Sequence, residues 1–162
     1  MIREATVQDL PAILEIYNHA IRETTAVYTY DEVTLSERQQ WLESKQKEGI
    51  PVYVYLQHDK VAGFATYGAF RNWPAYQYTV EHSVYVHPEY HRKGIASRLL
   101  EQVEYTLTEH GYQTVVAGID DSNSGSKLLH EKHGFEHIGT LKKVGYKFDQ
   151  WLDLAFYQKQ LK

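Results

Sequence analysis

The sequence predicts an α/β domain in which helices flank one mixed sheet. Segments rich in β-branched and aromatic residues interleave with segments of helical spacing, in the order β-α-α-β-β-β-α-β-α-β-β. The length of 162 residues is typical of one domain and is sufficient to bury a core. No repeat, linker or low-complexity segment divides the chain. We therefore expect a single domain over residues 1–162.

The N-terminal third of the chain is predicted to form a strand and two helices. "MIREAT" has the composition of a short strand. Asp9 is placed to cap the following helix, whose apolar residues recur at helical spacing over residues 10–21. Ser36 and Gln39 have the spacing of a capping box, which predicts a second helix over residues 36–48.

The rest of the chain alternates between strand and helix signals. "PVYVYL" and "VAGFATY" are joined by "QHDK" and predict a hairpin, and "YQYTVEHSVYV" predicts a longer, bulge-prone strand that ends before Pro88. A helix is expected from Gly94, followed by a strand at "TVVAGI". "SGSKLLHEKHG" predicts a short helix that stops at Gly134, and two β-rich segments follow from Phe135.

Composition excludes several classes of function. The formal net charge is −4 and no run of five like charges occurs, so neither nucleic acid nor an anionic membrane is an expected partner. The chain has no cysteine, which excludes thiol catalysis, disulfides and thiolate metal sites. The N-terminus lacks the apolar core of a signal peptide, and stretches such as "VYVYL" are too short to span a bilayer. We expect a cytoplasmic protein with a small-molecule partner.

The segment "HRKGIAS" predicts a binding site for phosphate. It places two cations and small residues at a helix start, where N–H groups without intrahelical partners attract anions. Neither the G-x-x-x-x-G-K-[ST] loop nor the G-x-G-x-x-G fingerprint is present, which excludes the two common nucleotide motifs. By itself the segment is equally compatible with an ordinary helix start and solvated side chains.

Two longer motifs resemble the GNAT acetyltransferase superfamily. "TVEHSVYVHPEYHRKGIASRLL" resembles its acetyl-CoA motif with the loop [QR]-x-x-G-x-[GA], although His91 stands where the family usually has Gln or Arg. "NSGSKLLHEKHGF" resembles its N-x-x-[AS]-x-x-[LF]-[YH]-x-x-x-G-[FY] segment. "IYNHAI", "TVEHSVYV" and "GTLKKVGYKFDQWLDLAFYQ" look like the phosphinothricin acetyltransferase group within it.

The resemblance implies a fold and an activity. The fold would be the GNAT fold, a central mixed and mostly antiparallel sheet flanked by helices. The activity would be transfer of the acetyl group of acetyl-CoA to a small amino-acid-like amine of the phosphinothricin or methionine sulfoximine type, by direct attack in a ternary complex. Other small amines, or a coenzyme A-binding module without turnover, are the alternatives. Members of the group resemble homodimers with sites near the subunit interface.

The resemblance also assigns the residues that bind the coenzyme. Backbone amides of the loop would hold the pyrophosphate, backbone groups of the preceding strand would pair with pantetheine, and the Asn123 side chain would lie beside pantetheine. The loop residues are Arg92, Lys93, Gly94, Ile95, Ala96 and Ser97, and the strand residues are Val84, Tyr85 and Val86.

Two residues are predicted to be catalytic. Strand alternation places Glu81 on the face opposite Val80 and His82, and group members have a glutamate there as general base. Without the resemblance, Glu81 either lines a wet cleft or is a solvent-facing residue at the strand edge. The resemblance places His130 near the coenzyme sulfur, where it would either donate a proton to the thiolate or serve a structural role.

The acceptor and metal predictions rest on local clusters. "RNWPAYQY", with Arg71 and Tyr76, is either an aromatic lid of the acceptor site or a packed loop, and Arg71 or Lys147 would bind the acceptor carboxylate. "HEKHGFEH" contains three histidines, but Gly134 ends the helix between the last two, so the ordered ligands of a zinc site are not expected. We therefore predict no metal.

Overall fold

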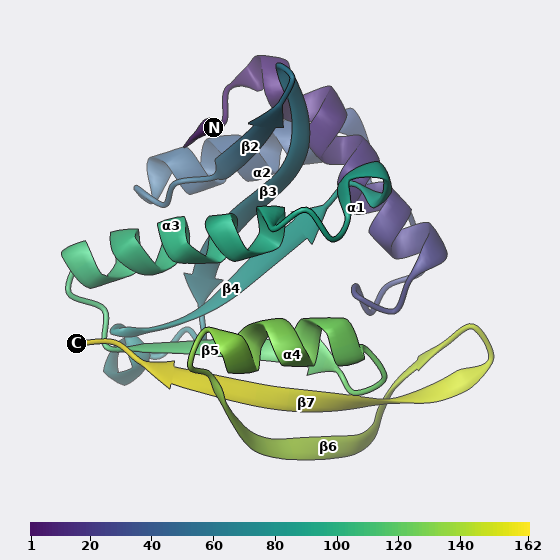
Figure 1. Cartoon of the computed structure of the whole chain (residues 1–162), viewed down its shortest axis with the longest axis vertical. Coiled ribbons are helices and arrows are strands. Elements are labelled where there is room, and N and C mark those ends of the chain that lie inside the picture. The colour runs from purple at the N-terminus through teal and green to yellow at the C-terminus, as the bar shows by residue number, and fades with distance from the viewer.

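Seven strands form one sheet in the order β1-β2-β3-β4-β5-β7-β6, and four helices flank it (Figure 1). The computed structural model describes all residues from Met1 to Lys162. The strands are β1 (Ile2–Glu4), β2 (Tyr53–Gln57), β3 (Lys60–Ala69), β4 (Thr79–Val86), β5 (Thr114–Asp120), β6 (Glu136–Lys147) and β7 (Gln150–Gln160). The helices are α1 (Leu10–Glu23), α2 (Leu35–Lys47), α3 (Ile95–Glu109) and α4 (Ser124–Lys132), with 3₁₀ turns η1 (Val7–Asp9), η2 (Pro74–Tyr76) and η3 (Pro88–Tyr90). None of the helices combines the length and apolar character needed to cross a lipid bilayer.

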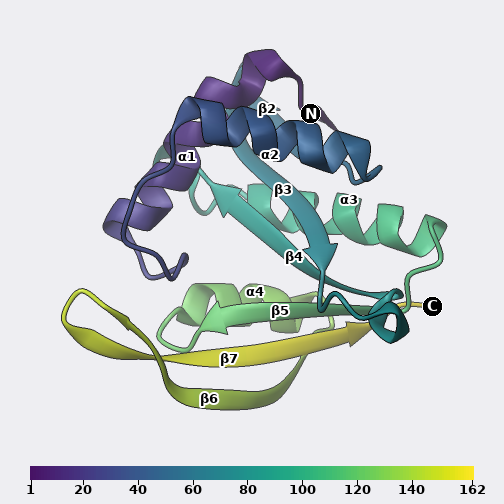
Figure 2. The ribbon, with the colours of Figure 1, turned by 180° about the vertical axis from the view of Figure 1, so that it is seen from behind.

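The parallel pair β4 and β5 divides the sheet. All other neighbouring strands are antiparallel, whereas β4 pairs with β5 only over Thr79–Glu81 against Thr114–Val116. Beyond this short stretch the two strands diverge, as Figures 1 and 2 show. We call this divergence the fork.

Each face of the sheet has its own core. Helices α1 and α2 cover one face, where they bury Ile13 against Val54 and Phe64. On the opposite face α3 buries Leu99 against side chains that include Val80. Figure 2 shows α1 and α2 in front of the sheet, and Figure 1 shows α3 and α4 in front of it from the other side. The apolar stripes of the helices therefore explain the layered arrangement.

The predicted element order and the mixed, mostly antiparallel sheet are confirmed. Two expectations about the strand predicted over residues 76–86 are wrong. It begins at Thr79 because Pro74 starts a 3₁₀ turn. It has no bulge, because β3 and β4 pair without a register shift from Val80 to Val86.

The side-chain caps predicted for the first two helices also need correction. The Asp9 carboxylate does not cap α1, because it accepts hydrogen bonds from the Thr6 amide at 2.8 Å and the Arg3 guanidinium at 2.7 Å. The capping box of α2 is formed by Thr34 and Glu37 instead of Ser36 and Gln39. Thr34 Oγ1 accepts from the Glu37 amide at 3.1 Å, and Glu37 Oε1 accepts from the Thr34 amide at 2.9 Å.

Thr34→Ala should lower the free energy of unfolding by about 1 kcal/mol, because it removes the side-chain acceptor at the start of α2. The matched control is Ser36→Ala, inside the first turn of the same helix. Urea denaturation compares the two variants. Equal stabilities, or a larger loss for Ser36→Ala, would contradict the assigned cap.

Candidate active site

The fork leaves one edge of β4 without a strand partner. Pairing with β3 continues to Val86, but pairing with β5 ends at Glu81. Backbone groups beyond Glu81 that point toward β5 therefore have no strand to bond, and an extended ligand can add there as a strand does. The predicted pantetheine-pairing residues Val84, Tyr85 and Val86 all lie in this segment.

The loop after β4 presents unpaired amides beside the open end of the fork. Gly94 precedes α3 with φ of +75°, and Arg92 also has a positive φ of +64°. No backbone carbonyl accepts a hydrogen bond from the amides of residues 92–97. The ring of His91, the residue that departs from the family pattern, bonds the Val86 carbonyl at 2.9 Å and so ties the loop to β4. The loop therefore has the geometry of an anion site.

Glu81 is the last residue of β4 that pairs with β5, so it lies at the apex of the fork. The side chain is half-buried, and its Oε2 is 3.4 Å from the position that a Cβ on Gly118 of β5 would occupy. Burial raises the pKa of Glu81, and the nearby charge of Arg71 opposes this shift. A carboxylate with a raised pKa is a stronger base, which suits proton transfer.

The predicted acceptor residues Arg71 and Tyr76 lie in the exposed loop between β3 and β4. Tyr76 packs edge-on against Phe70, with ring centroids 5.7 Å apart, and the Arg71 guanidinium lies 5.2 Å from the centroid of the same ring. The positive charge of Arg71 is near enough to Glu81 to oppose the rise in the pKa of that carboxyl.

His130 lies on the other face of the sheet, in contact with a histidine that the sequence did not single out. His130 Nε2 is 2.9 Å from His82 Nε2, and both side chains are buried. His130 Nδ1 is 2.7 Å from the Ser126 carbonyl, which can only accept, so Nδ1 carries the hydrogen. Nε2 of the neutral ring must then accept from His82. With both ring nitrogens bonded, His130 has no free N–H to offer a leaving thiolate.

The two imidazoles form a stacked pair in an apolar environment. Their ring centroids are 5.1 Å apart, their ring planes are nearly parallel, and Phe135 packs against both rings in a T-shaped arrangement. Burial, together with the neighbouring His130, lowers the pKa of His82 to about 3. Burial also lowers the pKa of His130. The only sequence signal for His82 was its place beside Glu81, on the face it shares with Val80.

Asn123 is the N-cap of α4. Its Oδ1 accepts from the Ser126 amide at 3.1 Å, and the side chain is exposed at the end of β5. A bond of 2.5 Å between Ser97 Oγ and His133 Nε2 connects α3 to α4. Asn123 therefore flanks the fork on the β5 side, and the loop before α3 flanks it on the β4 side.

Lys147 does not occupy the position expected of a residue that binds the acceptor carboxylate. Its side chain is buried at 2% exposure, and Nζ donates to the carbonyl oxygens of Thr24 at 2.8 Å and Val27 at 2.6 Å. Desolvation lowers its pKa. Lys147 instead fixes the segment after α1 to the end of β6.

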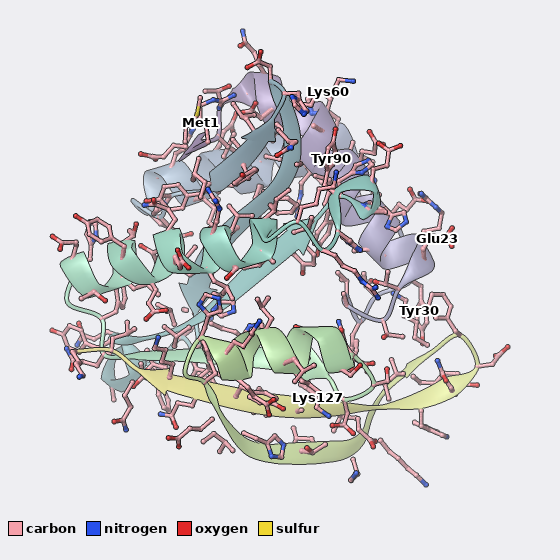
Figure 3. The ribbon with its side chains drawn as sticks, in the orientation of Figure 1. Met1, Glu23, Tyr30, Lys60, Tyr90 and Lys127 are labelled. Atoms are coloured by element: carbon pink, nitrogen blue, oxygen red, sulfur yellow. The ribbon has the colours of Figure 1, made fainter.

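Further contacts fix the same segment. The Tyr28 hydroxyl donates to Asp120 Oδ1 at 2.7 Å, and Thr25 Oγ1 donates to Asp120 Oδ2 at 2.9 Å. The Tyr30 hydroxyl donates to the Tyr146 carbonyl, and Figure 3 shows Tyr30 beside the β6–β7 hairpin. The segment from Thr24 to Tyr30 therefore connects α1 with the far side of the fork.

The three histidines of "HEKHGFEH" are not gathered around one point. His130 bonds His82, His133 bonds Ser97, and His137 bonds Thr140. No group of three His, Asp or Glu side chains has a metal-binding arrangement.

Comparison with known proteins identifies a family. A family model described as an acetyltransferase (GNAT) domain matches residues 2–156. The L-methionine sulfoximine/L-methionine sulfone acetyltransferase of Salmonella typhimurium strain LT2 is 41% identical over 160 residues, covering 99% of this chain and 94% of that protein.

Solved structures agree with this match. An N-acetyltransferase from Staphylococcus aureus Mu50 has 56% identity and a TM-score of 0.99, covering 100% of this chain and 98% of that one. A GNAT superfamily phosphinothricin acetyltransferase from Sinorhizobium meliloti, in complex with acetyl-CoA, has 34% identity and a TM-score of 0.96, covering 99% and 88%. The resemblance inferred from the motifs is confirmed.

The buried histidine pair should make the fold acid-sensitive. Below about pH 6.5 the His82 side chain is protonated in the unfolded chain, whereas in the folded chain it stays neutral until the pH approaches about 3. The free energy of unfolding therefore falls as the pH is lowered from about 6.5 toward about 3. The slope can reach about 1.4 kcal/mol per pH unit for each histidine.

Urea unfolding between about pH 8 and pH 5.5 measures this slope. His82→Leu should flatten it, whereas the control His137→Gln, at an exposed site, should keep the wild-type slope. Equal slopes for His82→Leu and the wild type would contradict the assignment.

Proposed function

Since the chain belongs to the GNAT acetyltransferase family and is an acetyl-CoA-dependent N-acetyltransferase, we propose that its acceptor is the α-amine of a small amino-acid-like compound such as methionine sulfoximine or phosphinothricin. The observation that carries the proposal is the fork, which brings a free strand edge, an anion-binding loop and one half-buried carboxylate together. The names of relatives with full-length similarity support the acceptor class.

On the coenzyme side, the backbone does most of the binding. The free edge of β4 at Val84 and Val86 pairs with the amide groups of pantetheine, and the amides of residues 92–97 receive the pyrophosphate. The predicted residue Tyr85 is not part of this edge, because the bond from the His87 amide to the Ala62 carbonyl sets a register in which the backbone groups of Tyr85 point toward β3. The charges of Arg92 and Lys93 add attraction for the phosphates. Asn123 reaches pantetheine from the β5 side of the fork.

On the acceptor side, Arg71 pairs with the acceptor carboxylate and Tyr76 closes over it. This arrangement orients the amine toward Glu81 at the apex. Lys147 has no part in carboxylate binding, because its ammonium is bonded to backbone carbonyls.

Transfer follows by direct attack. Glu81 accepts a proton from the acceptor ammonium, directly or through a water, and the free amine attacks the thioester carbonyl. A C–N bond forms, the C–S bond breaks, coenzyme A leaves as the thiolate, and the second proton of the attacking nitrogen passes to solvent. No acyl-enzyme forms on a thiol because the chain has no cysteine. Holding the two reactants in line supplies much of the acceleration, with effective molarities on the order of 10⁵ M or more.

His130 supports this geometry without donating a proton. Its bond to His82 fixes α4 against β4 one residue beyond Glu81. The thiolate is therefore stabilised by hydrogen bonds or protonated by solvent.

The functional unit is a homodimer. Six large apolar side chains of β6, β7 and their connection are exposed, a surface that a second copy would cover. They are Ile138, Leu141, Val144, Tyr146, Phe148 and Trp151. Sedimentation should give twice the chain mass, and Val144→Lys with Trp151→Lys should give the single mass. A wild-type monomer at micromolar concentration would contradict the dimer.

The acceptor assignment is tested by thiol release from acetyl-CoA with a panel of amines. Methionine sulfoximine, methionine sulfone and phosphinothricin should give turnover. Turnover only with polyamines, aminoglycosides or protein lysines would refute the proposed acceptor class.

Glu81→Gln should lower kcat/KM at pH 7 by roughly 10²- to 10⁴-fold, because the amide keeps the shape but loses the basicity. The defect should shrink as the pH rises, since more of the amine is then neutral. Acetyl-CoA affinity should be nearly unchanged, and Glu43→Gln on the exposed face of α2 is the control. Near-normal kcat/KM across the pH range would exclude Glu81 as the base.

Gly94→Glu should abolish coenzyme A binding, because it adds bulk and negative charge where the amides meet pyrophosphate. Gly49→Glu is a matched control, since Gly49 has a φ of +73° and, like Gly94, has no atom within 4 Å of the position that a Cβ would occupy. Both variants carry the same backbone strain. Calorimetry should therefore show lost affinity in Gly94→Glu only, and equal affinities would refute the site.

A further inference from the structure

Gly118 is an exposed residue in the interior of the sheet. It lies in the middle of β5, between β4 and β7, yet it is open to solvent. Its neighbours Ala117 and Ile119 are buried against α3 on the opposite face. On the face of Gly118, therefore, α1 and α2 do not reach the sheet, and the surface beside the fork is open.

The fold itself does not require a glycine at this position. Its φ is not positive, and a Cβ would lie 3.4 Å from Glu81 Oε2, 3.5 Å from Leu154 Cδ1 and 3.7 Å from Phe156 Cε1. These are ordinary contact distances, so a side chain fits without a clash. Glycine inside a strand weakens it and often marks the close approach of a ligand.

The surroundings of Gly118 match the needs of an amino-acid side chain. The Glu81 carboxylate lies on one side, and Leu154 and Phe156 supply apolar surface on the other. Two residues further along β5, Asp120 holds the segment that contains Tyr28, which closes that end. An acceptor whose amine meets Glu81 can extend its side chain only across this surface or into solvent.

Resting on the proposed function, we propose that Gly118 is the floor of the acceptor site and that its missing side chain admits the acceptor's own side chain. The chemical class that fits is an unbranched side chain with an apolar stem, which contacts Leu154 and Phe156. Gly118 is thus a residue that determines acceptor size beside the base.

The test compares Gly118→Ala and Gly118→Val with the wild type on acceptors of increasing side-chain length. KM for methionine sulfoximine should rise by roughly tenfold or more in Gly118→Val, because the added methyl groups exclude the acceptor. KM for the smallest amino acid that the wild type acetylates should change least. The affinity for acetyl-CoA should not change, and the thermal midpoint of Gly118→Ala should equal or exceed that of the wild type.

Gly139→Ala is the matched control, since Gly139 is also a strand glycine with a permissive φ and has no atom within 4 Å of a Cβ. Unchanged KM values for all acceptors in Gly118→Val would overturn the inference while leaving the proposed function intact. A wild-type protein that acetylates none of the acceptors would refute both. If Gly118→Val does not fold, the same comparison is made with Gly118→Ala: KM for methionine sulfoximine should rise relative to the wild type, and KM for the smallest acceptor should change least.

Discussion

The rest of the structure depends on the early end of pairing between β4 and β5. Hydrogen bonds between paired strands stabilise a sheet, yet β4 and β5 pair over only three residues and then separate. The outer edge of β4 stays paired with β3, and that of β5 stays paired with β7. The separation exposes a strand edge inside the sheet, which is normally filled or covered. An extended ligand with amide groups can satisfy this edge, and the loop before α3 and the Glu81 carboxylate lie at its two ends.

Different contacts hold the two faces of the fork. On the α3 and α4 face, the bonds between His82 and His130 and between Ser97 and His133 connect the helices across the fork. On the other face, Lys147 and Asp120 hold the segment that follows α1. The first face is closed by packed helices and the second stays open at Gly118. The separation of β4 from β5 is therefore fixed on one side and accessible on the other.

The sequence predicted the features that depend on local chemistry. The helix start at Gly94, the strand at Glu81 and the order of elements follow from turn residues and periodicity. The capping box was misplaced by two residues because Thr34 and Ser36 offer equivalent hydroxyls, and only the helix start distinguishes them.

Features that depend on distant contacts were beyond the sequence. The bond between His82 and His130 joins residues 48 apart, and the bond from Lys147 to Thr24 joins residues 123 apart. No local pattern encodes such pairs, so the sequence does not predict the role of His82. It predicts that Lys147 binds the acceptor carboxylate, whereas Lys147 bonds backbone carbonyls. Gly118 was also unremarkable in the sequence, because a strand glycine becomes informative only when its exposure is known.

Burial acts in opposite directions on the two adjacent residues at the apex. Removing water disfavours charge, so it raises the pKa of the Glu81 carboxyl and lowers the pKa of the His82 imidazole. Strand alternation sends these side chains to opposite faces, and each shift suits its face. The raised pKa strengthens a base on the open face, whereas the lowered pKa keeps the histidine pair neutral within the packed face. One short strand thereby separates the proposed site of proton transfer from the histidine contact that holds α4 against β4.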